Sequence, residues 1–316
     1  MGVHSSIEEL GKLANEPVVL AIGMFDGVHL GHQSVINLAI KEAITLQGRV
    51  VALTFAEHPA SFLRPGKEPA LIMNPQTKAS ELIEAGARDI ILRSFDREIA
   101  ELEAKEFANF LKNRIPSLSS ICVGKNFRFG KDRVGDYKVL KDSSKKIGTG
   151  VLVAESKLFL NQPISSSRIR KCLSRGEIEL VNEMLGRNYL VKGVVSPGKA
   201  MGRTIGFPTL NIPWNPEAQP AYGVYVGIVE NLSSDEKLPA VANYGLRPTI
   251  ESDAMNPLLE IHILEDMDSG IWCKESNLQM ELRKFLRPEK KFPTFEELKN
   301  QIAKDRKRAK EIAPSL

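Results

Sequence analysis

Two histidines stand three positions apart in the segment "GMFDGVHLGHQ", residues 23–33. These residues, His29 and His32, follow the apolar run "PVVLAI", and His32 opens the helical pattern "HQSVINLAIKEAITLQG". The glycines of the segment allow the backbone to approach a ligand closely, and the amide groups at a helix start attract anions such as nucleotide phosphates. The segment therefore predicts a phosphate site in which both histidines donate hydrogen bonds to phosphoryl oxygens.

Zinc binding is the first alternative for paired histidines. The zinc-protease motif needs two histidines four positions apart with a glutamate between them, whereas His29 and His32 are three apart and enclose no glutamate. The second alternative is structural, with one histidine capping the helix and the other packed. Two of the chain's five histidines occur here beside Asp26 and three glycines, and this clustering favours the phosphate site.

A second segment suited to phosphate is "ISSSRIR", residues 164–170. Ser165, Ser166 and Ser167 can cap a helix and bind phosphate through their hydroxyl groups. Arg170 lies one helical turn further on and carries a permanent positive charge. A serine cap followed by a basic first turn is the structural alternative, and the presence of the histidine segment favours phosphate binding.

A third segment, "VGKNFRFGKDRVGDY", residues 123–137, follows the apolar run "SSIC" and therefore begins at another strand end. It contains Asn126, Phe127, Arg128 and Phe129. A ligand-binding loop with Arg128 facing phosphate is one interpretation. Two core phenylalanines beside a solvated basic loop are an equally good interpretation of each residue taken alone.

The later half of the chain contains "GKAMGRTIGFPTLNI", residues 198–212. It is not a Walker phosphate loop, because an alanine follows Gly198 and Lys199 where that motif needs Ser or Thr after the lysine. Thr209 and Asn211 offer neutral oxygen ligands suited to Mg²⁺, which bridges to substrate phosphates. A glycine hairpin followed by a strand is the structural alternative.

The composition limits the class of protein. The chain has 316 residues, of which 42% are apolar and 26% charged, with a formal net charge of +4. It has no apolar run of about 18 residues and no secretory leader pattern, so we expect a cytoplasmic protein without a membrane partner. Three widely separated cysteines argue against a disulfide framework and a zinc knuckle. We expect small-molecule substrates, no nucleic acid, and a monomer or a weak homo-oligomer.

The order of the patterns divides the chain in two. Up to about residue 185, apolar runs alternate with helical patterns, which predicts a doubly wound α/β domain on a parallel sheet, with ligands at the carboxyl ends of its strands. Closely spaced strand patterns then predict an antiparallel β-barrel followed by a terminal helix, whose basic run "KDRKRAK" we expect on a solvated face. We place the boundary near Gly186, which gives domains of residues 1–186 and 187–316.

Several of these segments resemble the motifs of one family. The histidine segment is similar to the HxGH signature of nucleotidyltransferases, in the form found in bacterial bifunctional riboflavin kinase/FMN adenylyltransferases, also called FAD synthetases. "ISSSRIR" is similar to the family's ISSxxxR motif, and "PTLN" to the PTxN motif of flavokinases. "ANYGLRPTI" and "FLRPEKKF" resemble NxGxRPT and LRPExKF. The motifs follow the family's order from about residue 17 to residue 300.

The resemblance implies two ATP-dependent activities that use Mg²⁺. The barrel would transfer the γ-phosphoryl group of ATP to riboflavin and give FMN, with Glu260 accepting the proton of the 5′-hydroxyl group. The first domain would adenylylate FMN and give FAD and pyrophosphate, with His29, His32 and Arg170 as catalytic residues. An enzyme with one active domain, and a regulator that binds flavin without turnover, are the alternatives.

The resemblance also implies which residues bind each ligand. Those expected to bind ATP are Gly23, Phe25, Asp26, Ser165, Ser166, Ser167, Gly198, Lys199, Gly202, Arg203 and Thr204. Those expected to bind flavin are Asn126, Phe127, Arg128, Phe129, Asn243 and Arg287. Thr209 and Asn211 are expected to hold the metal ion.

Overall fold

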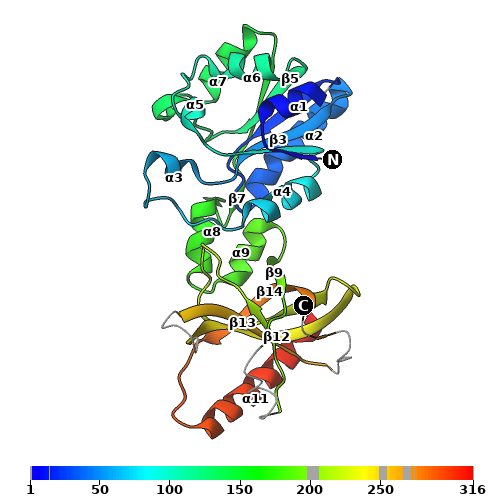
Figure 1. The fold of residues 1–316 in the computed structure, drawn as a ribbon, viewed down its shortest axis with the longest axis vertical. Coiled ribbons are helices and arrows are strands. Elements are labelled where there is room, and N and C mark those ends of the chain that lie inside the picture. Colours follow the sequence, from blue (N-terminus) through cyan, green and yellow to red (C-terminus); the bar gives the residue numbers. More distant parts are fainter. Residues whose placement is uncertain are drawn as a thin grey trace. The chain divides into compact units, whose positions relative to one another are not determined.

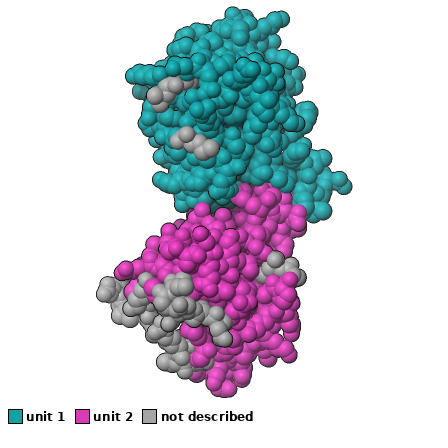
Figure 2. Space-filling model, turned by 90° about the vertical axis from the view of Figure 1, so that its right-hand side faces the viewer, with its two compact units in different colours: residues 1–166 teal, residues 167–316 magenta. Residues whose placement is uncertain are grey.

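The computed structural model describes residues 2–13, 15–197, 206–248, 255–265, 272–273 and 275–315. The chain divides into two compact units, residues 1–166 and 167–316 (Figure 2). Five residues expected to bind ATP lie outside the described residues. They are Gly198, Lys199, Gly202, Arg203 and Thr204.

The first unit is built on a sheet of six parallel strands. The strands are β1 (Gly2–His4), β2 (Val18–Ile22), β3 (Arg49–Phe55), β4 (Asp89–Arg93), β5 (Leu118–Gly124) and β6 (Gly150–Ala154). Their order in the sheet is β1-β4-β3-β2-β5-β6. From β2, the chain adds β3 and β4 on one side of β2 and then β5 and β6 on the other side. In such sheets ligands bind at the carboxyl ends of the two strands between which the winding reverses.

Helices cover both faces of this sheet, and the two groups can be followed in Figure 1. Alternate residues of a strand point to opposite faces, so Val18 and Leu20 of β2 pack in one core cluster while Val19 and Ala21 pack in another. The first cluster includes residues of α1 (Ile7–Leu13), α6 (Phe107–Arg114) and α7 (Tyr137–Lys145), and the second those of α2 (Leu30–Leu46) and α4 (Pro75–Glu84). Shorter elements are α3 (Pro59–Leu63), α5 (Arg97–Ala100), a 3₁₀ turn (Lys131–Arg133), β7 (Leu158–Phe159) and β8 (Gln162–Pro163). The predicted doubly wound α/β domain is confirmed.

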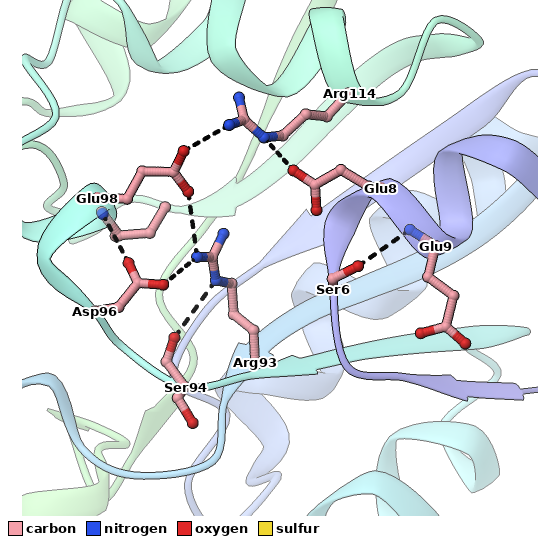
Figure 3. Close-up of polar contacts among 9 residues, drawn as sticks. Ser6, Glu8, Glu9, Arg93, Ser94, Asp96, Glu98 and Arg114 are labelled. Carbon is pink, nitrogen blue, oxygen red and sulfur yellow. Dashed lines mark hydrogen bonds and ion pairs between the residues drawn. The ribbon is translucent and has the colours of Figure 1, made fainter.

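Ion pairs join the elements on the first of these faces. Arg114 of α6 donates to Glu8 of α1 and, at 2.6 Å, to Glu98 of α5. Arg93 at the end of β4 contacts Asp96 and Glu98 at 2.5 and 3.5 Å (Figure 3). Because these carboxylates are about half exposed, each pair contributes about 1 kcal/mol or less. Apolar packing is therefore the main stabilisation of this face.

The second unit is built on six antiparallel strands. They are β9 (Tyr189–Val194), β10 (Leu210–Pro213), β11 (Gly223–Asn231), β12 (Glu236–Pro248), β13 (Met255–Ile263) and β14 (Asn277–Pro288), in the sheet order β10-β13-β12-β11-β14-β9. The two ends of the sheet meet where Ser196, just beyond β9, forms a bridge with Asn211 of β10. The amide of Ser196 donates to the carbonyl of Asn211 at 2.8 Å. The sheet thus curls on itself, in agreement with the predicted antiparallel barrel.

Two helices precede the barrel, α8 (Ser166–Leu173) and α9 (Ile178–Leu185). Asn182 of α9 donates to a carbonyl group of β14 at 2.9 Å and accepts from the amide of Tyr189 at 2.8 Å. Gly186, where we place the domain boundary, ends α9 in a left-handed conformation with φ of 72°. The compact unit of the barrel includes α9 and therefore starts before the boundary expected from the sequence.

The helix α11 (Phe295–Ile312) covers one face of the barrel sheet. Its Ala309 packs in one core cluster with Val224, Val226 and Val241. The exposed residues of its basic run include Lys307, Arg308 and Lys310, as expected for a solvated face. Neither α11 nor any other helix in the described part of the chain is both long and apolar enough to cross a membrane.

Candidate active sites

The loop between β2 and α2 has an unusual backbone. Phe25, Gly27 and Val28 have positive φ angles of 50°, 87° and 40°. Glycine adopts such angles freely, whereas they are strained for phenylalanine and for a β-branched valine. Phe25 and Val28 are buried, so packing holds them in this conformation. The sequence indicated the need for glycine in this loop but not the strain at its two apolar residues.

His29 and His32 lie together at the start of α2. His29 is the N-cap residue, and its Nδ1 accepts a hydrogen bond from the amide of His32 at 3.2 Å, which leaves Nε2 as the donor atom. The two rings stack with their centroids 3.6 Å apart, and Phe25 contacts His32 edge-on at 5.4 Å. A Cβ atom at Gly31 would lie 3.1 Å from the His29 ring, so glycine leaves room for the pair.

Electrostatics favour a neutral His32. Burial holds the pKa of His32 well below its usual range, and the charges of His29 and Lys78 act in the same direction. His32 therefore has a single ring N–H to donate at neutral pH. Its Nδ1 has no hydrogen-bond partner among the described residues. A neutral hydrogen-bond donor at the start of a helix is suited to an oxygen of a phosphate group.

The serine segment contacts the histidine loop. Ser166, the first residue of α8, donates from Oγ to the carbonyl of Asp26 at 2.8 Å, although the two are 140 residues apart in sequence. The carboxylate of Asp26 is buried and accepts from the amide of Ile72 at 2.9 Å. Asp26 thus shapes the loop through side chain and backbone alike. Ser167 is exposed, and Arg170 is partly exposed in the last turn of α8.

The third segment begins at the carboxyl end of β5, next to the end of β2. Asn126 and Arg128 are exposed and Phe127 is partly buried. Phe129 is buried, with its ring centroid 4.8 Å from that of Phe107 and 5.3 Å from that of Phe127. The structure therefore places Phe129 in the core, as the structural alternative describes, and Phe127 packs against the same core cluster, while Asn126 and Arg128 are exposed.

The barrel aligns four predicted residues in one row across its strands. Asn211 of β10 is paired with Glu260 of β13, which is paired in turn with Asn243 of β12. The row continues through Val224 of β11 to Arg287 of β14. Directly paired residues point to the same face of a sheet. Residues separated by up to 76 positions in sequence therefore share one face of the barrel.

The amide of Asn211 fits the predicted metal ligand. Asn211 is 6% exposed, and its Oδ1 has no hydrogen-bond partner among the described residues. A buried amide oxygen without a partner is costly, and a Mg²⁺ ion would satisfy it. Thr209, two residues earlier, is partly exposed. In the described part of the chain, no cluster of three or more His, Cys, Asp or Glu residues is arranged to hold a metal ion.

Glu260 and Arg287 have different surroundings. Glu260 is partly exposed between Leu259 and Ile261, which are fully buried on the opposite face of β13. The guanidinium of Arg287 donates from Nε and Nη2 to Asp305 of α11 at 2.7 to 3.2 Å. Glu260 is therefore accessible to a substrate. Arg287, by contrast, connects the row of paired residues to α11 through its hydrogen bonds to Asp305.

Two family models match the two parts of the chain. Residues 12–168 match the FAD synthetase model, and residues 185–313 match the riboflavin kinase model. Together with the α/β unit, the barrel and their polar clusters, these matches define a two-domain enzyme of the nucleotidyltransferase and kinase classes.

Relatives match over nearly the whole length. The bifunctional riboflavin kinase/FMN adenylyltransferase of Escherichia coli K12 is 34% identical, over 99% of this chain and 98% of the relative. The protein of that name from Haemophilus influenzae is 36% identical, over 98% of this chain and 97% of the relative. The one from Bacillus subtilis is 34% identical, over 92% of this chain and 91% of the relative. A crystal structure named as a macrolide-efflux protein from Streptococcus pneumoniae has a TM-score of 0.82 at 26% identity, over 98% of both chains. The chain belongs to the family of bifunctional riboflavin kinase/FMN adenylyltransferases.

Proposed function

We propose that the two activities of this family are carried out by the two clusters described above. The protein is a bifunctional enzyme of flavin cofactor biosynthesis, which phosphorylates riboflavin to FMN and adenylylates FMN to FAD. The observation that supports the proposal best is the hydrogen bond from Ser166 to Asp26, because it joins the ISSxxxR segment to the HxGH loop at the carboxyl edge of the sheet.

Adenylylation is assigned to the histidine loop. An oxygen of the FMN phosphate attacks the α-phosphorus of ATP, and the bond to the bridging oxygen breaks, so that pyrophosphate leaves with the electron pair. His29 and His32 donate hydrogen bonds to the phosphoryl oxygens, and Arg170 supplies positive charge. The remaining ATP contacts are assigned to Gly23, Phe25, Asp26 and the serines of "ISSSRIR". The flavin contacts are assigned to Asn126, Phe127 and Arg128, with Phe129 supporting this loop from the core.

Riboflavin phosphorylation is assigned to the barrel, residues 187–316. Glu260 accepts the proton of the 5′-hydroxyl group as its oxygen attacks the γ-phosphorus of ATP, and ADP leaves. Thr209 and Asn211 would hold Mg²⁺, which neutralises phosphate charge when bound. Asn243 and Arg287 are assigned to the flavin, and the residues of the 198–204 segment to ATP.

We also propose that the enzyme works in the cytoplasm on small molecules, as a monomer or a weak homo-oligomer and without nucleic acid. The mild net charge of +4 suits small anionic substrates as well as it suits nucleic acid, so the proposal of small-molecule substrates rests on the family's motifs.

Chromatography of reaction products tests the assignment of both activities. Riboflavin with Mg·ATP should yield FMN and then FAD, and FMN with Mg·ATP should yield FAD directly. FMN as the only product would mean that only the kinase is active. Flavin binding without any product would indicate a regulator. Either result would contradict the proposed function.

A further inference from the structure

A buried lysine contacts the histidine loop, residues 23–29 between β2 and α2. Lys78 of α4 is only 1% exposed. Its Nζ donates to the carbonyl of Phe55 at 2.5 Å and to that of Met24 at 3.4 Å. Thr54 donates to the same Met24 carbonyl at 2.9 Å. Phe55 ends β3 and Met24 lies two residues beyond β2, so the ammonium group joins the carboxyl ends of two neighbouring strands.

The stability of the fold does not account for a lysine at this position. Moving a charged group out of water costs several kcal/mol, and a methionine of similar length would avoid this cost. Burial lowers the pKa of Lys78 to about 8, although the charges of Asp26 and Glu57 oppose the shift. Ala79 and Leu82 beside it on α4 are buried and apolar. The hydrogen bonds of the ammonium group, rather than its burial, are therefore the reason for a lysine at this position.

We propose that Lys78 is a positioning residue for adenylylation, whose ammonium group fixes the loop that begins at Met24 against the end of β3. The inference rests on the proposed function, because it treats this loop as the nucleotide site. Met24 precedes Phe25, whose ring lies edge-on to His32. Because only Phe25 lies between Met24 and its contact with His32, a displacement of the Met24 carbonyl would also displace the histidine pair.

The charge of Lys78 acts on the same histidine pair. Burial is the largest cause of the low pKa of His32, and the charges of His29 and then Lys78 add to it. The acidic groups that interact with Lys78 itself are Asp26 and Glu57. Lys78 therefore holds the loop in place and also favours the neutral donor form of His32.

The test compares Lys78→Met with a matched control. Lys112 of α6 also donates from Nζ to a backbone carbonyl, that of Leu118, at 2.7 Å. Leu118 begins β5, so this contact lies at the amino edge of the sheet, opposite to the proposed site. Lys112→Met removes the same type of hydrogen bond from the same unit. Both variants are assayed for adenylylation of supplied FMN and for phosphorylation of riboflavin, and the pKa of His32 is measured by NMR.

Lys78→Met should lower kcat for adenylylation about 100-fold, as expected for a displaced reacting group, and should change the KM for ATP much less. Its riboflavin phosphorylation should remain at the wild-type rate, and the pKa of His32 should rise. Lys112→Met should keep both activities and the His32 pKa. An equal loss of adenylylation in both variants would overturn the proposal, and so would wild-type turnover in folded Lys78→Met.

Lys78→Gln keeps an N–H donor without the charge and serves if the methionine variant does not fold. It should raise the pKa of His32 and lower adenylylation, and an unchanged rate would overturn the proposal. A wild-type protein that makes no FAD from FMN would instead contradict the proposed function, so the two failures are distinguishable.

Discussion

Glu260 of β13 lies directly opposite Asn211 of β10 in the antiparallel ladder. This pairing places the proposed base of the kinase beside the proposed metal ligand, on the same face of the sheet. A slip of one residue in the register would turn one of the two side chains to the opposite face. The strand register is therefore as important to the proposed kinase site as the residue types.

Replacing Glu260 by glutamine should abolish most of the riboflavin phosphorylation. Glutamine keeps the shape of the side chain but cannot accept a proton at neutral pH, and a positioned base contributes about 10²- to 10⁴-fold to such a step. The measurement is kinase turnover with riboflavin, followed in the same protein by adenylylation of supplied FMN, which should survive. Glu230→Gln, on β11 and outside the row, is the matched control and should keep both activities. Unchanged kinase turnover in Glu260→Gln would make Glu260 an ordinary strand residue.

Replacing His29 by alanine should stop the reaction sequence at FMN. The variant loses both the Nε2 donor and the ring that stacks on His32. Loss of one transition-state donor typically lowers a rate about 10²- to 10³-fold. Chromatography of the products from riboflavin and Mg·ATP should show accumulation of FMN and little FAD. FAD formation at the wild-type rate would remove His29 from the catalytic group.

A kinase fragment should be more stable when it retains α9. Val181, Met184 and Leu185 of this helix are buried in the unit of the barrel, and burial of three such side chains contributes roughly 5 kcal/mol. We expect residues 167–316 to fold and phosphorylate riboflavin, and residues 187–316 to unfold at lower temperature. Thermal denaturation and kinase assays of both fragments test this. Equal stability of the two fragments would show that α9 contributes nothing to the barrel.

The pH dependence of stability should report the buried charge of Lys78. Its pKa is about 8 in the folded protein and 10.5 for a free lysine, so the unfolded chain binds more protons between these values. Stability from this group therefore rises with pH from about 8 to about 10.5, by roughly 3 kcal/mol in total. The difference in unfolding free energy between wild type and Lys78→Met, from denaturant titrations at several pH values, should show this rise. A difference independent of pH would mean that Lys78 titrates normally.

Local patterns were enough to predict the two folds and the start of a helix at the histidine loop. The apolar runs of residues 18–22 and 118–124 are buried parallel strands, and His29 caps the helix that follows the first of them. Such features depend on near neighbours in sequence. Strand register, by contrast, depends on the packing of the whole barrel, so the position of Asn211 opposite Glu260 could not be predicted.

Lys78 shows why contacts between distant elements could not be predicted from the sequence. In the pattern "PQTKASELIE" a lysine is typical of a solvated helix face. Its position four residues before the buried Leu82, on the same side of the helix, was the available indication that it faces inward. The carbonyl groups that it contacts belong to distant strands, and no local pattern reveals them.

The "ISSSRIR" segment is shared by the two compact units, since Ser165 and Ser166 belong to the first and Arg170 to the second. A chimaera made by exchanging whole compact units would therefore take Ser165 and Arg170 from different parents. A crossover at Gly186 instead keeps the segment intact, in a left-handed turn that tolerates a new junction when glycine is retained. Recombination between relatives keeps the adenylylation motifs of one parent together only when the crossover lies after Arg170, and a crossover between α8 and α9 would also leave α9 with the barrel.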